Sequence, residues 1–178
     1  MPLILHFSLN LIMSRHVLDE QDIRKLPPKE RLDKCSFMLK NSNDESLRWD
    51  AVWLAGEVAE TSDPGDPIFN EVADLMVWVL ENDDNGVVKH EAAFQIAARN
   101  MRKKIPDLIN SVLNDKSGLV QHEALESLGL MRAFEVEEII AKAVSDPNHD
   151  ISQTAAFVLK RFARLKGIKT EYKPYNIL

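Results

Sequence analysis

Apolar residues recur at helical intervals along most of this chain of 178 residues. They fall at i, i+3, i+4, i+7 and i+8, a spacing that collects side chains on one face of an α-helix. Two such sets are Val72, Leu75, Met76, Val79 and Leu80, and Val136, Ile139, Ile140, Ala143 and Val144. Turns rich in Asp, Asn and Gly separate the helical patterns at 83–86, 114–118 and 146–150. Because no segment alternates as a strand would, the chain is predicted to be all-α.

One part of the pattern occurs four times. KHEAA (89–93) and QHEAL (121–125) share a His-Glu pair followed by alanine. The same frame fits an earlier copy with Trp49-Asp50 in the His-Glu slot, and a later copy with Gln153-Thr154 there. The slots therefore start 41, 32 and 31 residues apart. The longer first interval contains 61–67, where Pro and Gly predict an insertion in a loop.

A helix pair every 31 or 32 residues is typical of an α-solenoid, because one pair cannot cover its apolar face without neighbours. We expect about four HEAT-like helix pairs, with 27–41 supplying the first helix. The repeat domain is expected over 27–166, between an N-terminal extension (1–26) and a C-terminal tail (167–178). The apolar residues 1–12 would be a docking segment, or would lie upstream of a start at Met13.

Composition narrows the classes of protein to consider. The chain is 45% hydrophobic and 28% charged, which is typical of a folded, soluble domain. Its net charge of −6 argues against a large nucleic-acid interface, and its apolar start is too short to span a membrane. Cys35 is the only cysteine and cannot form an internal disulfide, so a reducing compartment such as the cytoplasm is expected.

The His-Glu slot is the candidate metal-binding site. Second helices of adjacent repeats lie roughly 8–10 Å apart, so His90 and His122 could reach one metal ion. With Glu123 they would form a two-His-one-carboxylate set, typical of non-haem Fe(II) sites. Glu91 would bind the same ion or a second one. Glu126, one helical turn after His122, is placed to support a ligand or bind a cationic group.

Other interpretations of these residues stay open at this point. The spacing does not choose iron over zinc, and a Glu near a helix start also gains from the helix dipole without any metal. Four aromatic residues stand either at the His position of a slot or four residues after it. They would belong to the core or to a binding surface. They are Trp49, Trp53, Phe94 and Phe157.

Two segments also carry a resemblance to a known family. VVKHEAAFQIA (87–97) and LVQHEALESLGLM (119–131) resemble the His-Glu repeats of deoxyhypusine hydroxylase, and the similarity extends over about 44–165. The resemblance implies a HEAT-like solenoid with a di-iron centre that uses O2 to hydroxylate a deoxyhypusine side chain of a translation factor. Carried over, it makes iron ligands of His90, Glu91, His122 and Glu123, and a catalytic or substrate-binding carboxylate of Glu126.

The family pattern has two halves of four repeats and four His-Glu pairs, whereas this chain has two pairs and matches one half. A symmetric homodimer would restore the count, with two iron ions per dimer. In that arrangement His90, His122 and Glu123 hold one ion, and Glu91 crosses to the ion of the other chain. The resemblance thus implies a di-iron, O2-dependent monooxygenase acting on an amine-bearing protein side chain.

A second class of function is also consistent with the sequence. A plain HEAT-like scaffold would bind a protein partner on its concave face and catalyse nothing. A bilin-lyase-like HEAT protein is a third possibility, which the His-Glu pairs give no reason to prefer.

Overall fold

The computed structural model describes residues 19–167, and the expected docking segment and nearly all of the expected tail lie outside that range. Within it the chain is all-α, as predicted. The helices are α2 (Glu20–Arg24), α3 (Pro28–Asn41), α4 (Glu45–Glu60), α5 (Pro67–Asn82), α6 (Gly86–Ala98), α7 (Ile105–Asn114), α8 (Gly118–Leu130), α9 (Glu137–Ala143) and α10 (His149–Leu165). Two 3₁₀ turns, η1 (Arg102–Lys104) and η2 (Phe134–Val136), precede α7 and α9.

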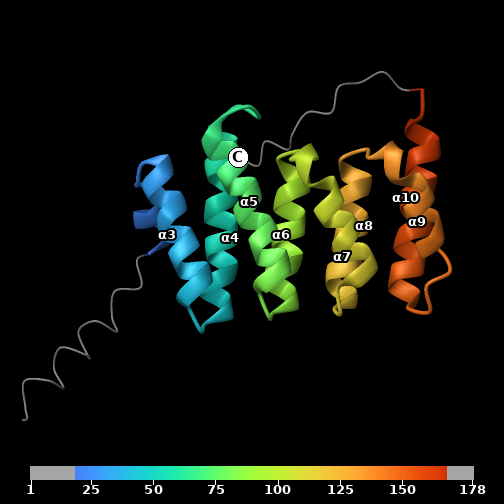
Figure 1. Cartoon of the computed structure of the whole chain (residues 1–178), viewed down its shortest axis with the longest axis horizontal. Coiled ribbons are helices and arrows are strands. Elements are labelled where there is room, and N and C mark those ends of the chain that lie inside the picture. The colour runs from blue at the N-terminus through green and yellow to red at the C-terminus, as the bar shows by residue number, and fades with distance from the viewer. Residues whose placement is uncertain (1–18, 168–178) are drawn as a thin grey trace, which may run out of the picture.

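Four antiparallel helix pairs stand in a row, α3/α4, α5/α6, α7/α8 and α9/α10 (Figure 1). The second helices pack side by side, α4 on α6, α6 on α8 and α8 on α10. We call these four helices the second-helix layer. The predicted solenoid is confirmed, and the alanine that follows each slot explains the close packing, because Ala51, Ala92, Ala124 and Ala155 are all fully buried.

An aspartate organises the turns that lead into α6, α8 and α10. Asp83, Asp115 and Asp146 each accept a hydrogen bond at 2.8 Å from the backbone N–H two residues further on. Two of them also bind the preceding repeat: Arg48 reaches Asp83 and Lys89 reaches Asp115, both at 2.8 Å. These two turns are therefore tied to the preceding repeat, which fixes where α6 and α8 start.

The opposite ends of α6 and α8 are shaped by two residues in the left-handed region, Asn100 (φ 51°) and Arg132 (φ 52°). The next N–H donates back into each helix, from Met101 to the carbonyl of Ile96 at 2.9 Å and from Ala133 to that of Leu128 at 3.1 Å. This is a helix-ending pattern that closes the last turn and reverses the chain. The 3₁₀ turns η1 and η2 follow directly.

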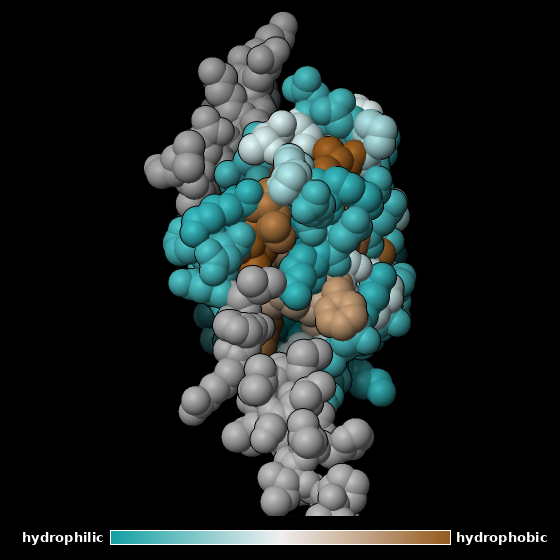
Figure 2. Space-filling model, turned by 90° about the vertical axis from the view of Figure 1, so that its left-hand side faces the viewer, coloured by the Kyte–Doolittle hydropathy of each residue, from teal (hydrophilic) through white to brown (hydrophobic). Residues whose placement is uncertain are grey.

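The first pair is covered by α2, which falls in the range expected as an extension. Ile23 is buried there, and Arg24 contacts Glu57 of α4 at 2.9 Å. The face of the molecule at this end is mostly hydrophilic with small hydrophobic patches (Figure 2), as the end of a solenoid needs to be. None of the helices between residues 19 and 167 is both long and apolar enough to cross a membrane.

Candidate metal centre

The two His-Glu pairs meet across the contact between α6 and α8. His90 Nε2 on α6 lies 3.0 Å from Glu123 Oε2 on α8. Glu123 is only 5% exposed, so this carboxylate lies inside the helix contact and His90 covers it. The hydrogen bond to Glu123 raises the pKa of His90, although partial burial opposes it. The pairing brings one imidazole and one carboxylate from neighbouring repeats together.

His122 is held one repeat further along, by α10. Its Nδ1 lies 2.7 Å from the hydroxyl oxygen of Thr154, and that hydroxyl donates its only proton to the carbonyl of Asp150 at 2.6 Å. The hydroxyl must therefore accept from His122, so Nδ1 carries a proton and Nε2 has the free lone pair in the neutral ring. Nε2 faces Glu126 Oε2 at 3.8 Å. A ring oriented through Nδ1–H is the usual arrangement of a metal-binding histidine.

Glu91 is 6% exposed and faces along its own helix. Its Oε1 accepts a hydrogen bond from Gln95 Nε2 at 2.6 Å, and burial raises the pKa of the carboxyl. Gln95 in turn lies against Gly56 of α4, where a Cβ would come within 1.9 Å of its Oε1. The glycine therefore leaves the room in which Gln95 can support Glu91.

Ser127 holds the matching position on α8. Its hydroxyl donates to the carbonyl of Ala93 at 3.0 Å and lies 3.4 Å from Glu123 Oε1. Gln95 and Ser127 both come four residues after the slot glutamates, and both are fully buried. The flanking repeats have Leu54 and Val158 there. Sequence reasoning missed these two supports. The sequence does carry a signal, because the position four residues after the second slot residue is polar only in the two repeats that have a His-Glu pair.

The expected ligands are thus brought near one another without converging. His90 pairs with Glu123, His122 faces Glu126, and Glu91 contacts Gln95. Over residues 19–167 no three His, Cys, Asp or Glu side chains gather closely enough to hold a metal ion. The chemistry of the donors still fits a metal ion, because the hydrogen-bond partners of Glu91 and Glu123 are His, Gln and Ser, with no Arg or Lys bound directly to either carboxylate.

Aromatic rings border this polar strip on the side of α4. Trp49 stacks on Trp53 with ring centres 6.2 Å apart, and Trp53 stacks on Phe94 of α6 at 6.4 Å. Trp49 is 37% exposed, and Phe157 on α10 is 61% exposed. Trp53 and Phe94 are half-buried. None of the four rings is fully buried, so these aromatic positions lie at the surface rather than in the core, which decides between the two interpretations left open by the sequence.

A family model described as HEAT repeats matches residues 72–160, which is half of the chain. The chain belongs to the HEAT-repeat family, in agreement with the helix pairs described above.

Among curated proteins, the chain is similar to deoxyhypusine hydroxylases. It is 32% identical to that of Homo sapiens over 95 residues, 51% of this chain and 31% of the relative. It is 26% identical to that of Schizosaccharomyces pombe over 141 residues, 78% of this chain and 42% of the relative. The chain thus spans about a third to two fifths of the curated relatives it matches.

The solved structure of human deoxyhypusine hydroxylase in complex with glycerol is similar in fold. The TM-score is 0.67 at 23% identity, over 83% of this chain and 49% of that one. The likeness covers about half of the solved chain.

Proposed function

We propose that this protein is an iron-binding hydroxylase of the deoxyhypusine hydroxylase type, with His90, Glu91, His122 and Glu123 as its ligands. The observation that carries the proposal is the pair of contacts across the second-helix layer. His90 meets Glu123 at 3.0 Å, and Thr154 orients His122 at 2.7 Å. The similarity to deoxyhypusine hydroxylases supports the same assignment.

Each side chain has a task that its surroundings explain. Thr154 keeps the Nε2 lone pair of His122 available, and the two histidines supply neutral nitrogen donors. Glu91 and Glu123 supply negative charge in a buried place, where a cation is stabilised more strongly than in water. When bound, iron supplies the dioxygen chemistry of such hydroxylases.

The substrate class we propose is an amine-bearing side chain of a protein, as the name of the similar enzymes suggests. Glu126 is partly exposed beside His122, so its carboxylate can accept an ammonium group at the edge of the site. Asp50 of α4, in the column of Glu91 and Glu123, adds a second carboxylate on the same layer. The bound amine would thereby be positioned next to the donors.

We further propose that the working unit is a homodimer in the cytoplasm, with two iron ions. The chain carries two His-Glu pairs, half the number implied for the family, and a two-fold interface would bring two such layers face to face. The exposed rings of Trp49 and Phe157 support this, because aromatic side chains commonly anchor interfaces.

The test is to purify the protein without a metal-affinity tag, load it with Fe(II) anaerobically, and measure iron per chain together with mass in solution. About one iron per chain in a dimer is expected. A monomer that stays free of metal after loading contradicts the proposal.

Matched histidine variants locate the site. His90→Ala and His122→Ala should each abolish bound iron while leaving helicity nearly unchanged, because both rings are about one-third exposed. His149→Ala is the control, since His149 is exposed at the start of α10 and away from the slot. Equal iron in all three variants places the metal elsewhere.

A non-catalytic scaffold is the second candidate. It is favoured by the exposed aromatic strip and by the lack of any three converging donors within the described part of the chain. In that case a protein partner would bind the second-helix layer, and both histidine variants would retain partner binding while no variant holds metal.

A further inference from the structure

Two hollows in the surface share Trp49 and Asp50 of α4. The larger, of about 390 Å³, is also lined by Val87 and Val88 at the start of α6, and the smaller, of about 230 Å³, by residues of α2. Neither lining includes the four expected metal ligands or Glu126. Because Trp49 and Asp50 occupy the slot of the first repeat, the hollows extend the row of slots by one helix.

The larger hollow carries negative charge without a cation beside it. Glu45 and Asp50 belong to its lining, which contains no Arg or Lys. Neither carboxylate makes a hydrogen bond or an ion pair with another residue of the described range 19–167. Asp50 is half-buried, and burial raises the pKa of its carboxyl, as do the nearby charges of Glu20 and Asp44. A cation at this place would offset the unfavourable burial of charge.

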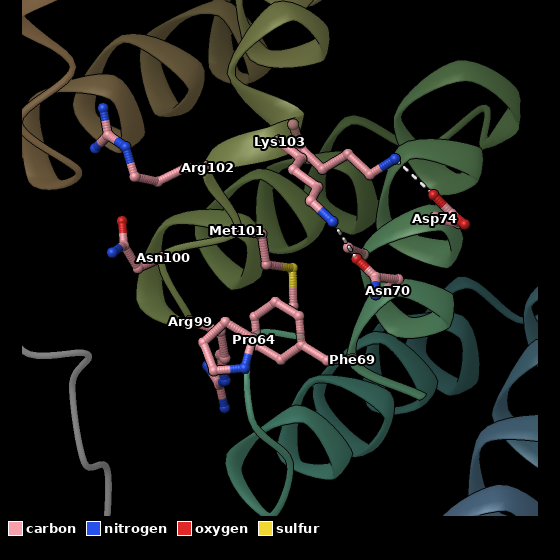
Figure 3. Close-up of a pocket in the computed structure, with 11 residues that line it drawn as sticks. Pro64, Phe69, Asn70, Asp74, Arg99, Asn100, Met101, Arg102 and Lys103 are labelled. Carbon is pink, nitrogen blue, oxygen red and sulfur yellow. Dashed lines mark hydrogen bonds and ion pairs between the residues drawn. The ribbon is translucent and has the colours of Figure 1, made fainter. Parts of the chain in front are cut away.

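The cations of other hollows are already paired. Arg24, in the lining of the smaller hollow, is bound by Glu20 and Glu57 at 2.8 and 2.9 Å. A cavity of about 600 Å³ beside η1 (Figure 3) has a basic lining, but carboxylates of the chain hold most of that charge. The pairs are Arg99 with Glu60, Arg102 with Glu135, and Lys104 with Asp74. Among these hollows, the half-buried charge without a partner is therefore that of Asp50, although the charge of Arg24 also acts on it.

The ring beside this carboxylate also lacks a cation. Trp49 is 37% exposed, and the face of a tryptophan attracts Lys and Arg side chains. The other two tryptophans each carry a cation of the chain, since Arg99 lies 5.9 Å from the centre of the Trp53 ring and Lys40 lies 5.3 Å from that of Trp78. Within residues 19–167 no such contact is made by Trp49.

We propose that the larger hollow binds a lysine or arginine side chain of a protein partner, with its charge at Asp50 and Glu45. Its hydrocarbon stem would lie against Trp49 and against Val87, which is 52% exposed. An acidic occupant would meet two carboxylates and no cation, and an apolar occupant would bury Asp50 unpaired, which is unfavourable. A long basic side chain satisfies both parts of the hollow, because its stem is apolar and its end is charged.

The inference deepens the proposed function and rests on it in one respect, namely that a protein binds the second-helix layer. Neighbouring second helices lie roughly 8–10 Å apart, so the helix of Asp50 is one spacing from that of His90 and two from that of Glu126. A substrate protein with its amine at Glu126 would therefore place a second basic residue at Asp50. The contact in the hollow itself needs no iron.

The probe is a capped peptide with one lysine between two leucines, titrated into the full chain before iron loading. The indole N–H signals of the three tryptophans are followed by NMR and assigned with Trp→Phe variants. A saturable shift of the Trp49 signal is expected, with Trp78 unchanged. Asp50→Asn should weaken binding about five- to tenfold, because the carboxylate loses its charge. Glu138→Gln is the matched control, since it makes the same charge change at an exposed position of α9.

Four results would overturn the proposal. The first is no saturable shift of Trp49, and the second is an equal loss in Asp50→Asn and Glu138→Gln, which would mean general attraction by charge. The third is equal binding of a peptide with glutamine in place of lysine. The fourth is binding of butylammonium as tight as that of the peptide, which would make the hollow a site for free amines.

Two further measurements separate this inference from the proposed function. Because Trp49 is also proposed to anchor the dimer, mass in solution is measured with the peptide at saturation and should not change. A fall from dimer to monomer would mean that a second copy, not another protein, occupies the hollow. Iron per chain is measured on the same Asp50→Asn variant and should equal that of the unchanged protein, so failure of peptide binding and failure of iron binding are seen independently.

Discussion

Glu57 and Glu91 are two glutamates on neighbouring helices of the second-helix layer, and their surroundings differ. Glu57 on α4 accepts hydrogen bonds from Arg24 at 2.9–3.2 Å and from Arg31. Burial raises the pKa of its carboxyl, but the two arginines outweigh burial and leave the pKa lowered. Glu91 on α6 is more buried, its nearest partner is the neutral amide of Gln95, and its pKa is raised.

The difference distinguishes a carboxylate that stabilises the fold from one that is placed to bind a ligand. Burying a negative charge is unfavourable unless a cation accompanies it. At Glu57 the chain itself provides the cations, from α2 and α3. At Glu91 and Glu123 the hydrogen-bond partners are Gln95, His90 and Ser127. The charge of Arg99 also acts on Glu91, but Arg99 is paired with Glu60, so a bound metal ion would add positive charge at this place. Buried acids that bind no Arg or Lys directly mark candidate functional sites.

The largest expected effect comes from Glu123→Gln. It removes one donor oxygen and the charge beside His90, so iron affinity should fall on the order of a hundredfold or more. Competition with a chelator under anaerobic conditions measures this. Glu57→Gln is the matched control and should keep the affinity of the unchanged protein. If both variants bind iron equally well, the contrast between the two glutamates has no bearing on metal.

Thr154→Val should have the next largest effect. It keeps the size of the side chain and removes the oxygen that accepts from His122 Nδ1, so the ring loses its fixed orientation. Iron affinity should fall about 10- to 100-fold, with helicity unchanged. Thr154→Ser retains the hydroxyl and should restore most of the affinity. A valine variant that binds as tightly as the unchanged protein would show that Thr154 serves packing alone.

The sequence predicted the repeat frame well because helix pairing in a solenoid is local. Aligning the repeats shows the alanine after each slot, the aspartates of the turns and the inserted loop. The side-chain contacts of the site were harder to predict from the sequence. We expected His90 and His122 to converge, whereas His90 meets Glu123 and His122 meets Thr154, since a one-residue offset between neighbouring helices decides which columns face each other. The Arg24–Glu57 contact depends on α2, which has too few residues for a periodic pattern.

Glu57→Gln should reduce the free energy of unfolding by about 1–2 kcal/mol, between the values for exposed and fully buried ion pairs. Because the folded-state pKa of Glu57 is lowered, its contribution is present above the unfolded-state pKa and is lost as pH falls through the folded-state pKa. Urea denaturation should therefore separate the two proteins at neutral pH and bring them together in acid. Glu138→Gln, at an exposed position of α9, should change stability by less than about 0.5 kcal/mol. A difference that persists in acid would mean that packing, not charge, is lost.

Glu91→Gln should have the smallest effect on the metal-free protein, and of the opposite sign. The substitution keeps the shape of the side chain and an oxygen that can accept from Gln95, while it removes a buried charge whose pKa is already raised. Stability measured by urea denaturation with a chelator present should be unchanged or higher by up to about 1 kcal/mol. The same variant should bind iron more weakly than the unchanged protein. The Glu91 carboxylate would then destabilise the metal-free fold and stabilise bound iron. If Glu91→Gln instead destabilises the metal-free protein as much as Glu57→Gln does, Glu91 is part of the scaffold and the distinction between the two glutamates fails.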